Sequence, residues 1–415
     1  MAESYDIAIV GGGAAGLAAA IFAAEAAPRA RIVILEGAAT IGAKILISGG
    51  GRCNVTNAEV RAQDFNGAQT FIRNVLAAFD AMSARRWFES LGVPLQEEEH
   101  GKLFPVSNRA RSVVDALLVR CDALGVTILC DHRVDDVATG DGFSVHTRHS
   151  PIRARCVVLA SGGRSLPRTG SDGSGWQIVR RLGHTVTETY PALVPLVMQP
   201  TFFHAALSGL SHGVELSTFV DAKLADRRRG SLLFTHFGIS GPVVLDASRH
   251  WVLAQAQGRA AELRCSFVPG ESFEAVERGI MAAAVARPSS TPLRILAENM
   301  PERLVLELLR VAGVEASMPL AQLSRLQRRA LVHALVELPL PVEGSRGWDY
   351  AEVTAGGVPL GEVSFRSMES RRLPRLYLIG EMLDCDGRIG GFNFQWAWAT
   401  GFVAGRAAAA GGKQT

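Results

Sequence analysis

The sequence lacks the features that mark several classes of protein. Its six cysteines are scattered and form no Cys-x-x-Cys pair, which argues against a disulfide framework, a zinc site and a thioredoxin-type redox pair. Aromatic residues make up 7% of the 415 residues and the net charge is +3, so the composition does not favour binding to nucleic acid. We therefore expect no bound metal and a small molecule, rather than nucleic acid, as the substrate.

Long apolar runs are also missing. The longest apolar stretches are rich in alanine and are interrupted by Glu25, Arg29 or Arg406, so none is typical of a membrane-spanning helix. The first residues contain neither the basic nor the apolar segment of a secretory signal. We therefore expect a cytoplasmic protein that does not enter a membrane. The sequence does not indicate its oligomeric state.

A glycine-rich motif stands near the start of the chain. Residues 11–16 read Gly-Gly-Gly-Ala-Ala-Gly, follow the apolar run 7–10 and precede an alanine-rich stretch. A strand, this turn and a helix together form the G-x-G-x-x-G unit that binds a dinucleotide. Gly11 permits the tight turn, Gly13 lets a pyrophosphate approach the backbone, and Gly16 lets the helix pack closely on the strand. The free N–H groups of the helix then face the phosphates.

An acidic residue completes this pattern. A second apolar run, residues 32–35, ends on Glu36, twenty residues after Gly16. A carboxylate at this place accepts a hydrogen bond from a ribose 2′-hydroxyl and repels a 2′-phosphate. The first domain is therefore predicted to hold a dinucleotide.

Two later segments also predict contact with the cofactor. The apolar strand 156–160 ends on Ser161-Gly162-Gly163, small residues that leave room beside a dinucleotide. Residues 375–379 predict another strand, and a helix follows the glycines at 390–391. Because this second helix start should meet the first motif in space, the region between them is expected to be an insertion.

Periodicity predicts the remaining elements. In the first part we expect helices at 69–91 and 109–124, and strands at 126–130, 133–138 and 143–147. In the middle we expect strands at 214–220, 231–234 and 262–268, then helices over 272–338. The alternating runs favour an antiparallel sheet or a small barrel. The triplet 227–229, three arginines, is expected on the solvated tip of a hairpin.

In the segment 42–57, Gly-Ala-Lys-Ile-Leu-Ile-Ser-Gly-Gly-Gly-Arg-Cys-Asn-Val-Thr-Asn, the three glycines followed by Arg52 and Asn54 indicate a loop that can wrap a flat ring. Together with 233–242, 354–358 and 380–399, it resembles the NAD(P)/FAD-dependent oxidoreductases of the BaiN-like or aminoacetone-oxidase-like type. The likeness covers nearly the whole chain. It implies an α/β fold in which a Rossmann-like FAD-binding domain, with a parallel sheet and helices, is interrupted by an inserted antiparallel β-barrel plus helical domain.

The domain boundaries follow from these patterns. The first part of the FAD-binding domain is expected in residues 1–189, the inserted barrel and helical domain in 190–347, and the second part in 348–415.

The resemblance implies the positions that bind FAD. They are Gly11, Gly13, Ala14, Ala15 and Gly16 at the pyrophosphate, Glu36 at the ribose, Lys44, Gly49, Gly50, Gly51, Arg52, Cys53 and Asn54 along the flavin, Val134 at the adenine, Ser161 and Gly162 at the strand end, and Gly380, Glu381, Asp386, Gly391, Phe392 and Asn393 at the second helix start.

Four side chains are open to two interpretations each. His236 is either an acid/base that faces the flavin or a structural histidine. Lys44 is either an electrostatic partner of the flavin or a surface charge. Cys53 and Cys385 are either a redox pair or small buried residues. No catalytic residue is therefore assigned, and His236 and Lys44 are the candidates.

The function predicted from the sequence is that of an FAD-dependent oxidoreductase, which transfers a hydride between flavin and a small organic substrate. The chain has no second dinucleotide motif, so NADH or NADPH is expected to dock only transiently. Two alternatives stay open. One is an oxygen-dependent oxidase of amines such as aminoacetone, and the other is an FAD-bound partner in RNA modification.

Overall fold

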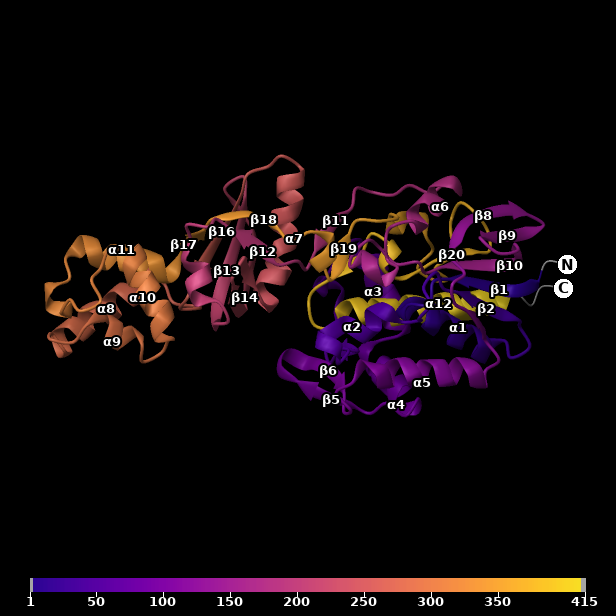
Figure 1. The fold of residues 1–415 in the computed structure, drawn as a ribbon, viewed down its shortest axis with the longest axis horizontal. Helices are drawn as coiled ribbons and strands as arrows, with labels where there is room; N and C mark the ends of the chain where they lie inside the picture. Colours follow the sequence, from indigo (N-terminus) through magenta and orange to yellow (C-terminus); the bar gives the residue numbers. More distant parts are fainter. Residues whose placement is uncertain (1–2, 412–415) are drawn as a thin grey trace. The chain divides into compact units, whose positions relative to one another are not determined.

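The structure, a computed structural model, describes residues 3–411 and divides into two compact units. Unit 1 contains the residues up to Pro191 and those from Glu352 onward, and unit 2 is Ala192–Ala351. Figure 1 labels their helices and strands. The predicted domains also include residues 1–2 and 412–415, which lie outside the described residues.

A parallel sheet forms the core of unit 1. Its strand order is β7-β2-β1-β10-β9-β8, and β20 also pairs with β10. The strands are β1 (Ser4–Val10), β2 (Ile32–Leu35), β7 (Thr127–Leu129), β8 (Val134–Gly140), β9 (Gly142–Thr147), β10 (Ile152–Leu159) and β20 (Leu376–Leu378). Strand β9 runs antiparallel to both of its neighbours, β10 and β8, and the other pairs of this sheet are parallel. The central strands are buried along most of their length, as expected for parallel strands that are covered on both faces.

The helices of unit 1 are α1 (Ala14–Ala26), α2 (Ala43–Gly51), α3 (Gln69–Ala78), α4 (Ala81–Ser90), α5 (Ala110–Ala123), α6 (Gly175–Arg181) and α12 (Phe392–Gly411). Small sheets accompany them: β3 (Thr56–Asn57) and β5 (Leu95–Glu98) flank β6 (Lys102–Pro105), β4 (Phe65–Asn66) pairs with β21 (Asp386–Gly387), and β11 (Tyr190–Ala192) pairs with β19 (Val353–Ala355).

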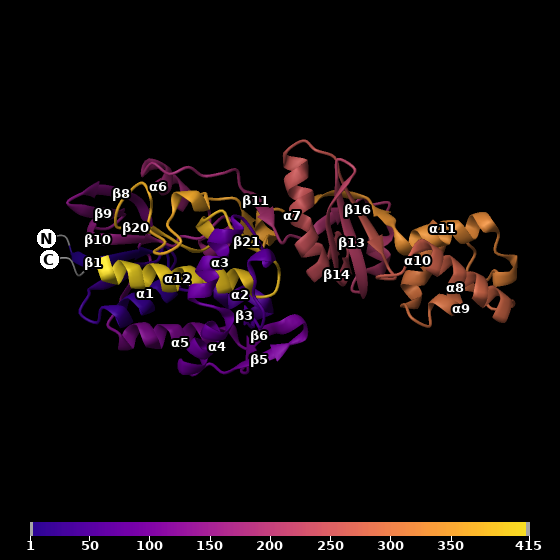
Figure 2. The same cartoon turned by 180° about the vertical axis from the view of Figure 1, so that it is seen from behind.

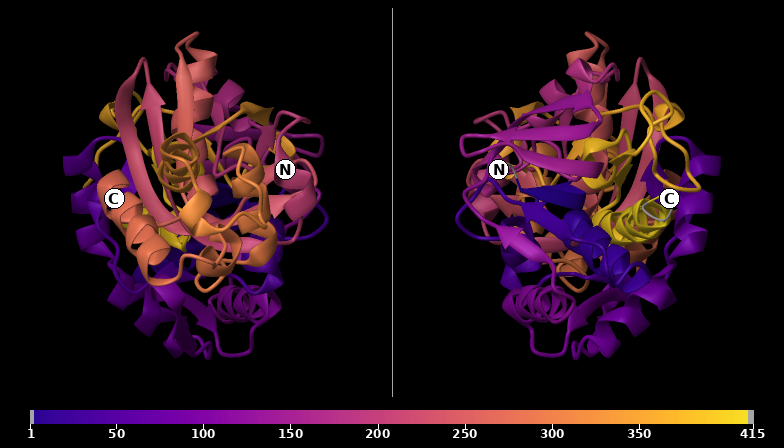
Figure 3. Two further views of the ribbon diagram at one scale, coloured as in Figure 1. Left: turned by 90° about the vertical axis from the view of Figure 1, so that its left-hand side faces the viewer. Right: turned by 90° about the vertical axis from the view of Figure 1, so that its right-hand side faces the viewer.

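Helix α12 packs very closely on α1, although almost the whole chain separates them in sequence. A Cβ at Gly401 would lie 2.8 Å from the carbonyl oxygen of Ala15, and one at Gly405 would collide with that of Ala19. The two helices meet through alanine and glycine because larger side chains would hold the backbones apart. Figure 3 shows α12, in yellow, beside the indigo elements of the N-terminal βαβ unit.

Of two predictions about local structure in unit 1, one is wrong and one is confirmed. The helix expected at 69–91 is two helices, because Asp80 caps α4 by accepting a hydrogen bond from the Ser83 N–H at 2.7 Å. The loop predicted at the three glycines is present, because the residues from Ala43 are helical only as far as Ser48. Gly49 and Gly50 then turn the backbone with positive φ, at 56° and 68°.

Unit 2 combines an antiparallel sheet with helices (Figure 2). The strand order is β17-β16-β13-β14-β15-β12-β18. The elements are β12 (Leu196–Met198), β13 (Ser211–Val220), β14 (Lys223–Thr235), β15 (Gly238–Ser240), α7 (Pro242–Ala256), β16 (Ala261–Ser266), α8 (Phe273–Ala286), α9 (Pro292–Leu296), α10 (Glu302–Val311), α11 (Arg325–Val336), β17 (Leu338–Leu340) and β18 (Val342–Ser345).

The predicted fold class is confirmed as an α/β fold with a Rossmann-like parallel sheet and additional antiparallel strands. The sheet of unit 2 has two edge strands, β17 and β18, which do not pair with each other. It is therefore an open antiparallel sheet and not the barrel that the resemblance implies. None of the helices within residues 3–411 has both the length and the apolar character that crossing a membrane requires.

The arginine triplet is not at a hairpin tip. Asp221 and Ala222, both with positive φ, form the tip of the β13–β14 hairpin, and the triplet lies inside β14. Arg227 and Arg229 pair with Glu215 on the neighbouring strand, while Arg228 pairs with Asp226. Carboxylates on the neighbouring strand and on β14 itself therefore pair with these three charges.

A buried histidine joins two segments of unit 1. His184 Nδ1 lies 2.7 Å from Glu362 Oε2, and its Nε2 lies 2.8 Å from Ser370 Oγ. Glu362 also accepts hydrogen bonds from Arg372 and Thr185. Burial acts to raise the pKa of Glu362, but these hydrogen bonds outweigh it and lower the pKa to about 2.

This network predicts a stability difference that depends on pH. Because the folded-state pKa of Glu362 is below its ordinary value of 4.5, the ionised carboxylate stabilises the fold above pH 4.5, and this contribution disappears as the pH falls toward 2. Glu362→Gln should therefore lower the thermal midpoint at pH 7, and its difference from wild type should shrink between pH 4.5 and 2. Glu271→Gln, at an exposed position, is the control. A difference that does not change with pH would contradict the assignment.

Candidate functional site

The glycine-rich turn lies between β1 and α1, as the sequence predicts. Gly11 has a φ of 105°, and a Cβ there would lie 2.5 Å from the carbonyl oxygen of Ala160. A Cβ at Gly16 would collide with the carbonyl oxygen of Gly11. A Cβ at Gly13, by contrast, would meet no atom within 4 Å. Two of the glycines are thus required by the fold, and the third leaves open space at the N-terminus of α1.

Glu36 stands at the end of β2 with its carboxylate held in place. Oε2 accepts a hydrogen bond from the N–H of Gly12 at 2.8 Å, and Oε1 accepts one from that of Ala38 at 2.9 Å. The acid is therefore tied to the glycine turn itself. Each oxygen has further acceptor capacity for a hydroxyl group of a ligand.

The C-terminal motif, which begins at Gly380, lies next to this glycine turn. A Cβ at Gly380 would lie 2.9 Å from the Cβ of Ala15, at the start of α1. Ser161, which follows β10, also lies close to the glycine turn, since a Cβ at Gly11 would be 3.1 Å from the Cα of Ser161. Three strand ends, after β1, β10 and β20, therefore meet at the N-terminus of α1. Ligands of open α/β sheets bind at this edge.

The start of α12 is fastened to the segment 53–57. Thr56 Oγ1 donates to Gln395 Oε1 at 2.7 Å, and Trp398 Nε1 donates to the carbonyl oxygen of Val55 at 2.9 Å. Asn57 Nδ2 donates to the carbonyl oxygen of Gly390 at 3.1 Å. The predicted flavin-lining segment and the second helix start are thus brought together by hydrogen bonds between side chains and backbone.

Lys44 forms an ion pair inside unit 1. Its Nζ lies 2.7 Å from Glu381 Oε2 and also donates to the hydroxyl groups of Ser165 and Ser171. Glu381 Oε1 accepts hydrogen bonds from Ser165 Oγ and from the N–H of Thr354, at 2.5 and 2.9 Å. Burial acts to raise the pKa of Glu381, but the Lys44 ammonium and these hydrogen bonds outweigh it and lower the pKa. Lys44 is therefore paired with a carboxylate and is not an isolated surface charge.

Ser165, Ser171 and Thr354 are the members of this network that the sequence analysis missed. All three are buried, at 7% exposure or less. A usable signal was present, because Ser165 follows the Ser161-Gly162-Gly163 segment closely and Thr354 opens the Thr-Ala-Gly-Gly-Val run.

The cysteines near the site do not have the properties of reactive thiols. Cys53 is fully buried, and burial raises its pKa to about 12 against a smaller opposite effect of a hydrogen bond with Ser48. Cys385 is 1% exposed. Because the thiolate is the nucleophile, a thiol with such a pKa is inert at neutral pH. This favours the interpretation of Cys53 as a small buried residue.

Other predicted site residues have clear protein partners. Arg52 pairs with Glu98 at 2.8 Å, and its guanidinium carbon lies 4.0 Å from the ring centroid of Phe104. Asp386 accepts a hydrogen bond from Asn66 at 2.9 Å, and Asn393 exchanges two hydrogen bonds with the Gly387 backbone. Val134 is buried at the start of β8, and Phe392 packs edge-on against Phe65. His236 lies in unit 2, in the turn between β14 and β15, with its side chain exposed.

Several predicted positions have the properties that a bound FAD requires. Asn54 Oδ1 and Ser161 Oγ are buried and have no hydrogen-bond partner among the described residues. Gly13 and Gly50 both leave open space where other residues would place a Cβ. Buried polar atoms without a partner are rare, and a polar ligand with hydroxyl and N–H groups would satisfy them. The residues present therefore fit a dinucleotide cofactor.

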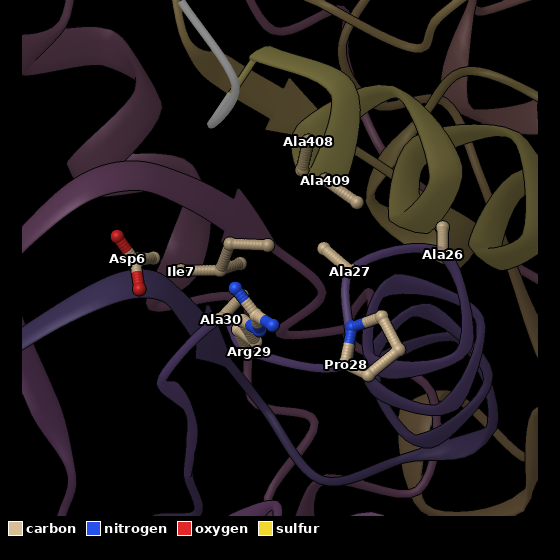
Figure 4. Close-up of a pocket in the computed structure, with 9 residues that line it drawn as sticks. All are labelled: Asp6, Ile7, Ala26, Ala27, Pro28, Arg29, Ala30, Ala408 and Ala409. Atoms are coloured by element: carbon tan, nitrogen blue, oxygen red, sulfur yellow. The ribbon is translucent and has the colours of Figure 1, made fainter. Parts of the chain in front are cut away.

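A pocket of about 460 Å³ in unit 1 lies elsewhere (Figure 4). It is lined by Asp6, Ile7, Ala26, Ala27, Pro28, Arg29, Ala30, Ala408 and Ala409. These residues belong to the beginning of β1 and to the ends of α1 and α12, whereas the glycine turns are at the opposite ends of these elements. The pocket is thus separate from the dinucleotide site.

Comparison with known proteins was made at the level of sequence and of structure. A family model described as the HI0933-like protein Rossmann domain matches residues 5–407. The 3-dehydro-bile acid delta(4,6)-reductase of Clostridium scindens is 36% identical over 405 residues, which cover 97% of this chain and 98% of that protein. A ribosomal RNA dihydrouridine synthase of Escherichia coli is 32% identical over 403 residues, 97% of each chain.

Two solved structures share the fold. The 3-ketosteroid delta1-dehydrogenase of Sterolibacterium denitrificans, in complex with 1,4-androstadiene-3,17-dione, superposes with a TM-score of 0.53 at 13% identity, over 99% of this chain and all of that chain (100%). A quinol-fumarate reductase with menaquinol molecules has a TM-score of 0.52 at 16% identity, over 99% of this chain and 71% of that chain. At these identities the likeness concerns the fold alone.

The glycines of the first turn predict a separation between folding and cofactor binding. Gly13→Ala adds a methyl group in open space, so the protein should fold normally but bind FAD at least about tenfold more weakly, because the methyl group blocks the approach of the pyrophosphate. Gly11→Ala is the matched variant and should lower the thermal midpoint, since its φ is positive and its Cβ would collide with Ala160. Thermal unfolding and FAD titration measure the two effects. Unchanged FAD affinity in Gly13→Ala would contradict the site.

The Lys44–Glu381 ion pair predicts that removing one of the two charges destabilises the protein more than removing both. Lys44→Met should lower the free energy of unfolding by about 2 kcal/mol, because it leaves the partly buried Glu381 carboxylate without its charged partner. The double variant Lys44→Met/Glu381→Met should recover most of this loss, since it removes both charges. Lys223→Met, on the exposed start of β14, is the control. Denaturant unfolding measures the difference, and a double variant less stable than Lys44→Met would contradict the prediction.

Proposed function

The chain belongs to the HI0933-like Rossmann-domain family and is an FAD-dependent oxidoreductase, and from this premise we propose that it reduces a carbon–carbon double bond conjugated to a carbonyl group. The proposed electron source is NADH or NADPH. The observation that carries the proposal is the 36% identity to a delta(4,6)-reductase along nearly the whole of both chains.

The names of the relatives share one kind of chemistry. A delta(4,6)-reductase that acts on a 3-dehydro-bile acid saturates double bonds of a ring that carries a carbonyl group. A dihydrouridine synthase saturates the double bond of uracil, which is also conjugated to a carbonyl group. In the reaction that we propose for this chain, a hydride adds to the carbon of the double bond that is farther from the carbonyl group, and a proton adds to the nearer one. A reductase of this bond type is supported by both names, although their substrates differ greatly in size.

The residues of unit 1 have defined tasks in this proposal. The glycine turn and the N-terminus of α1 would bind the pyrophosphate, and Glu36 would accept a hydrogen bond from the ribose. Ser161 Oγ would exchange a hydrogen bond with a polar group of the cofactor, Asn54 Oδ1 would accept one, and the start of α12 would stabilise negative charge near it. Bound FAD supplies the hydride chemistry, while the chain positions it and sets its electrostatic surroundings.

We also propose that the protein acts in the cytoplasm on a small molecule. Its six cysteines are free thiols, which suits a reducing compartment. The arginine triplet of unit 2 is paired with carboxylates and so offers no unneutralised basic patch for a nucleic acid. Ribosomal RNA is the second candidate substrate, favoured by the 32% identity to a dihydrouridine synthase.

The test starts from the purified, FAD-loaded protein without oxygen. NADH or NADPH should bleach the yellow flavin absorbance, and addition of a conjugated ketone such as 4-androstene-3,17-dione or cyclohexenone should restore it with formation of the saturated product. Bleaching by primary amines but not by either nicotinamide would contradict the reductase and indicate an amine oxidase. Dihydrouridine formation in ribosomal RNA, with no turnover of any free ketone, would instead establish the second candidate.

A further inference from the structure

An ion pair in unit 1 joins two segments near the acid that is predicted to bind the ribose of FAD. Arg133 Nη2 lies 2.6 Å from Asp172 Oδ2, and 39 positions of sequence separate the two residues. Arg133 directly precedes β8, whereas Asp172 lies in the segment 160–174, which connects β10 to α6. The pair therefore fastens the segment 160–174 to the residues that lead into β8.

Both of the joined segments lie next to Glu36 and Gly37. The N–H of His132 donates to the carbonyl oxygen of Glu36 at 2.8 Å, and a Cβ at Gly37 would lie 3.4 Å from the Cβ of Arg133. In the segment 160–174, a Cβ at Gly170 would lie 3.8 Å from Glu36 Oε1. The ion pair thus links two segments that border the same carboxylate.

The segment 160–174 has little regular structure of its own. It contains one short helix, Pro167–Thr169, and four residues with positive φ. Near its start, the N–H of Ser165 donates to Thr354 Oγ1 at 3.1 Å. Near its end, Asp172 Oδ1 accepts a hydrogen bond from the N–H of Ser174 at 3.0 Å, while the other oxygen faces the arginine. Side-chain bonds of this kind therefore decide where the segment lies.

The exposure of the pair indicates what it can do. The two side chains are 46% and 34% exposed. Burial acts to raise the pKa of Asp172, but the hydrogen bonds from Arg133 and Ser174 outweigh it and lower the pKa, so the carboxylate is charged at neutral pH. An exposed ion pair contributes little to the stability of a whole fold. Its effect is therefore expected in the local ordering of one segment, where small free energies matter.

We propose that Arg133 and Asp172 are positioning residues for the adenosine half of FAD, because their ion pair holds the segment 160–174 beside Glu36 before the cofactor binds. This rests on the proposed placement of the ribose at Glu36. A segment that must become ordered on binding loses conformational entropy, which weakens affinity, whereas a segment already in place does not. FMN has the flavin but no adenosine half, so its binding does not depend on this pair.

The test is titration of the full-length protein, freed of bound flavin, with FAD and with FMN. Arg133→Gln and Asp172→Asn should each raise the dissociation constant of FAD by about threefold and leave that of FMN unchanged. Asparagine keeps an oxygen for the N–H of Ser174, so Asp172→Asn removes the charge and not this hydrogen bond. The double variant should bind FAD no more weakly than either single variant, because both changes remove the same interaction.

A second ion pair of unit 1 provides the matched control. Arg181 Nε lies 2.8 Å from Asp136 Oδ1, with 48% and 44% of the two side chains exposed, so Arg181→Gln breaks a similar pair and should bind FAD like the wild type. An unchanged FAD dissociation constant in Arg133→Gln or in Asp172→Asn would overturn the proposal. A loss of the same size in Arg181→Gln, or an equal loss of FMN affinity, would also overturn it.

Glu36→Gln separates the ion pair from the placement of the cofactor. Weaker FAD binding in Glu36→Gln, with unchanged binding in Arg133→Gln and Asp172→Asn, would keep the ribose site and refute the role of the pair. Unchanged FAD binding in all three variants would refute both. Binding does not require turnover, so these results do not depend on which substrate the protein reduces.

Discussion

The close packing of α12 on α1 is the contact on which the arrangement of the FAD-binding unit depends. Gly401 and Gly405 let the backbone of α12 approach Ala15 and Ala19 of α1 to a distance that any side chain would prevent. Through this contact, the end of β20 and the start of α12 reach the glycine turn that follows β1. Two motifs separated by more than three hundred residues thereby become one site.

Electrostatics strengthens the same arrangement. Lys44 and Glu381 are 337 positions apart in the sequence, yet their ion pair joins α2 to the segment that follows β20. Ser165, Ser171 and Thr354 complete the hydrogen bonds of the two charges. A charge removed from water is costly unless it is paired and hydrogen-bonded, so this network commits four separate segments to one geometry. The predicted cofactor positions Ser161 and Asn54 have polar atoms that remain without protein partners, as befits a binding site.

The sequence predicted the local elements of the site well because their causes are local. The turn at Gly11–Gly16 needs only glycine in the right places, and Glu36 needs only to end the next strand. The same reasoning failed where a single side chain or a partner strand decides the outcome. Asp80 ends one helix and starts another, and Glu215 draws the arginine triplet into a strand rather than a hairpin tip. Neither event is visible in the periodicity of apolar residues.

By itself, the sequence determined the α/β class, the dinucleotide turn and the membership in a flavoprotein family, since these follow from residue order within short segments. Only the tertiary structure decided which distant side chains meet. It gave Lys44 a carboxylate partner, tied Arg52 to Glu98, and placed Arg346 against two rings that come from different segments of unit 2. The physical reason is that packing and charge pairing act through space, so they depend on how the whole chain folds and not on the neighbours of a residue in the sequence.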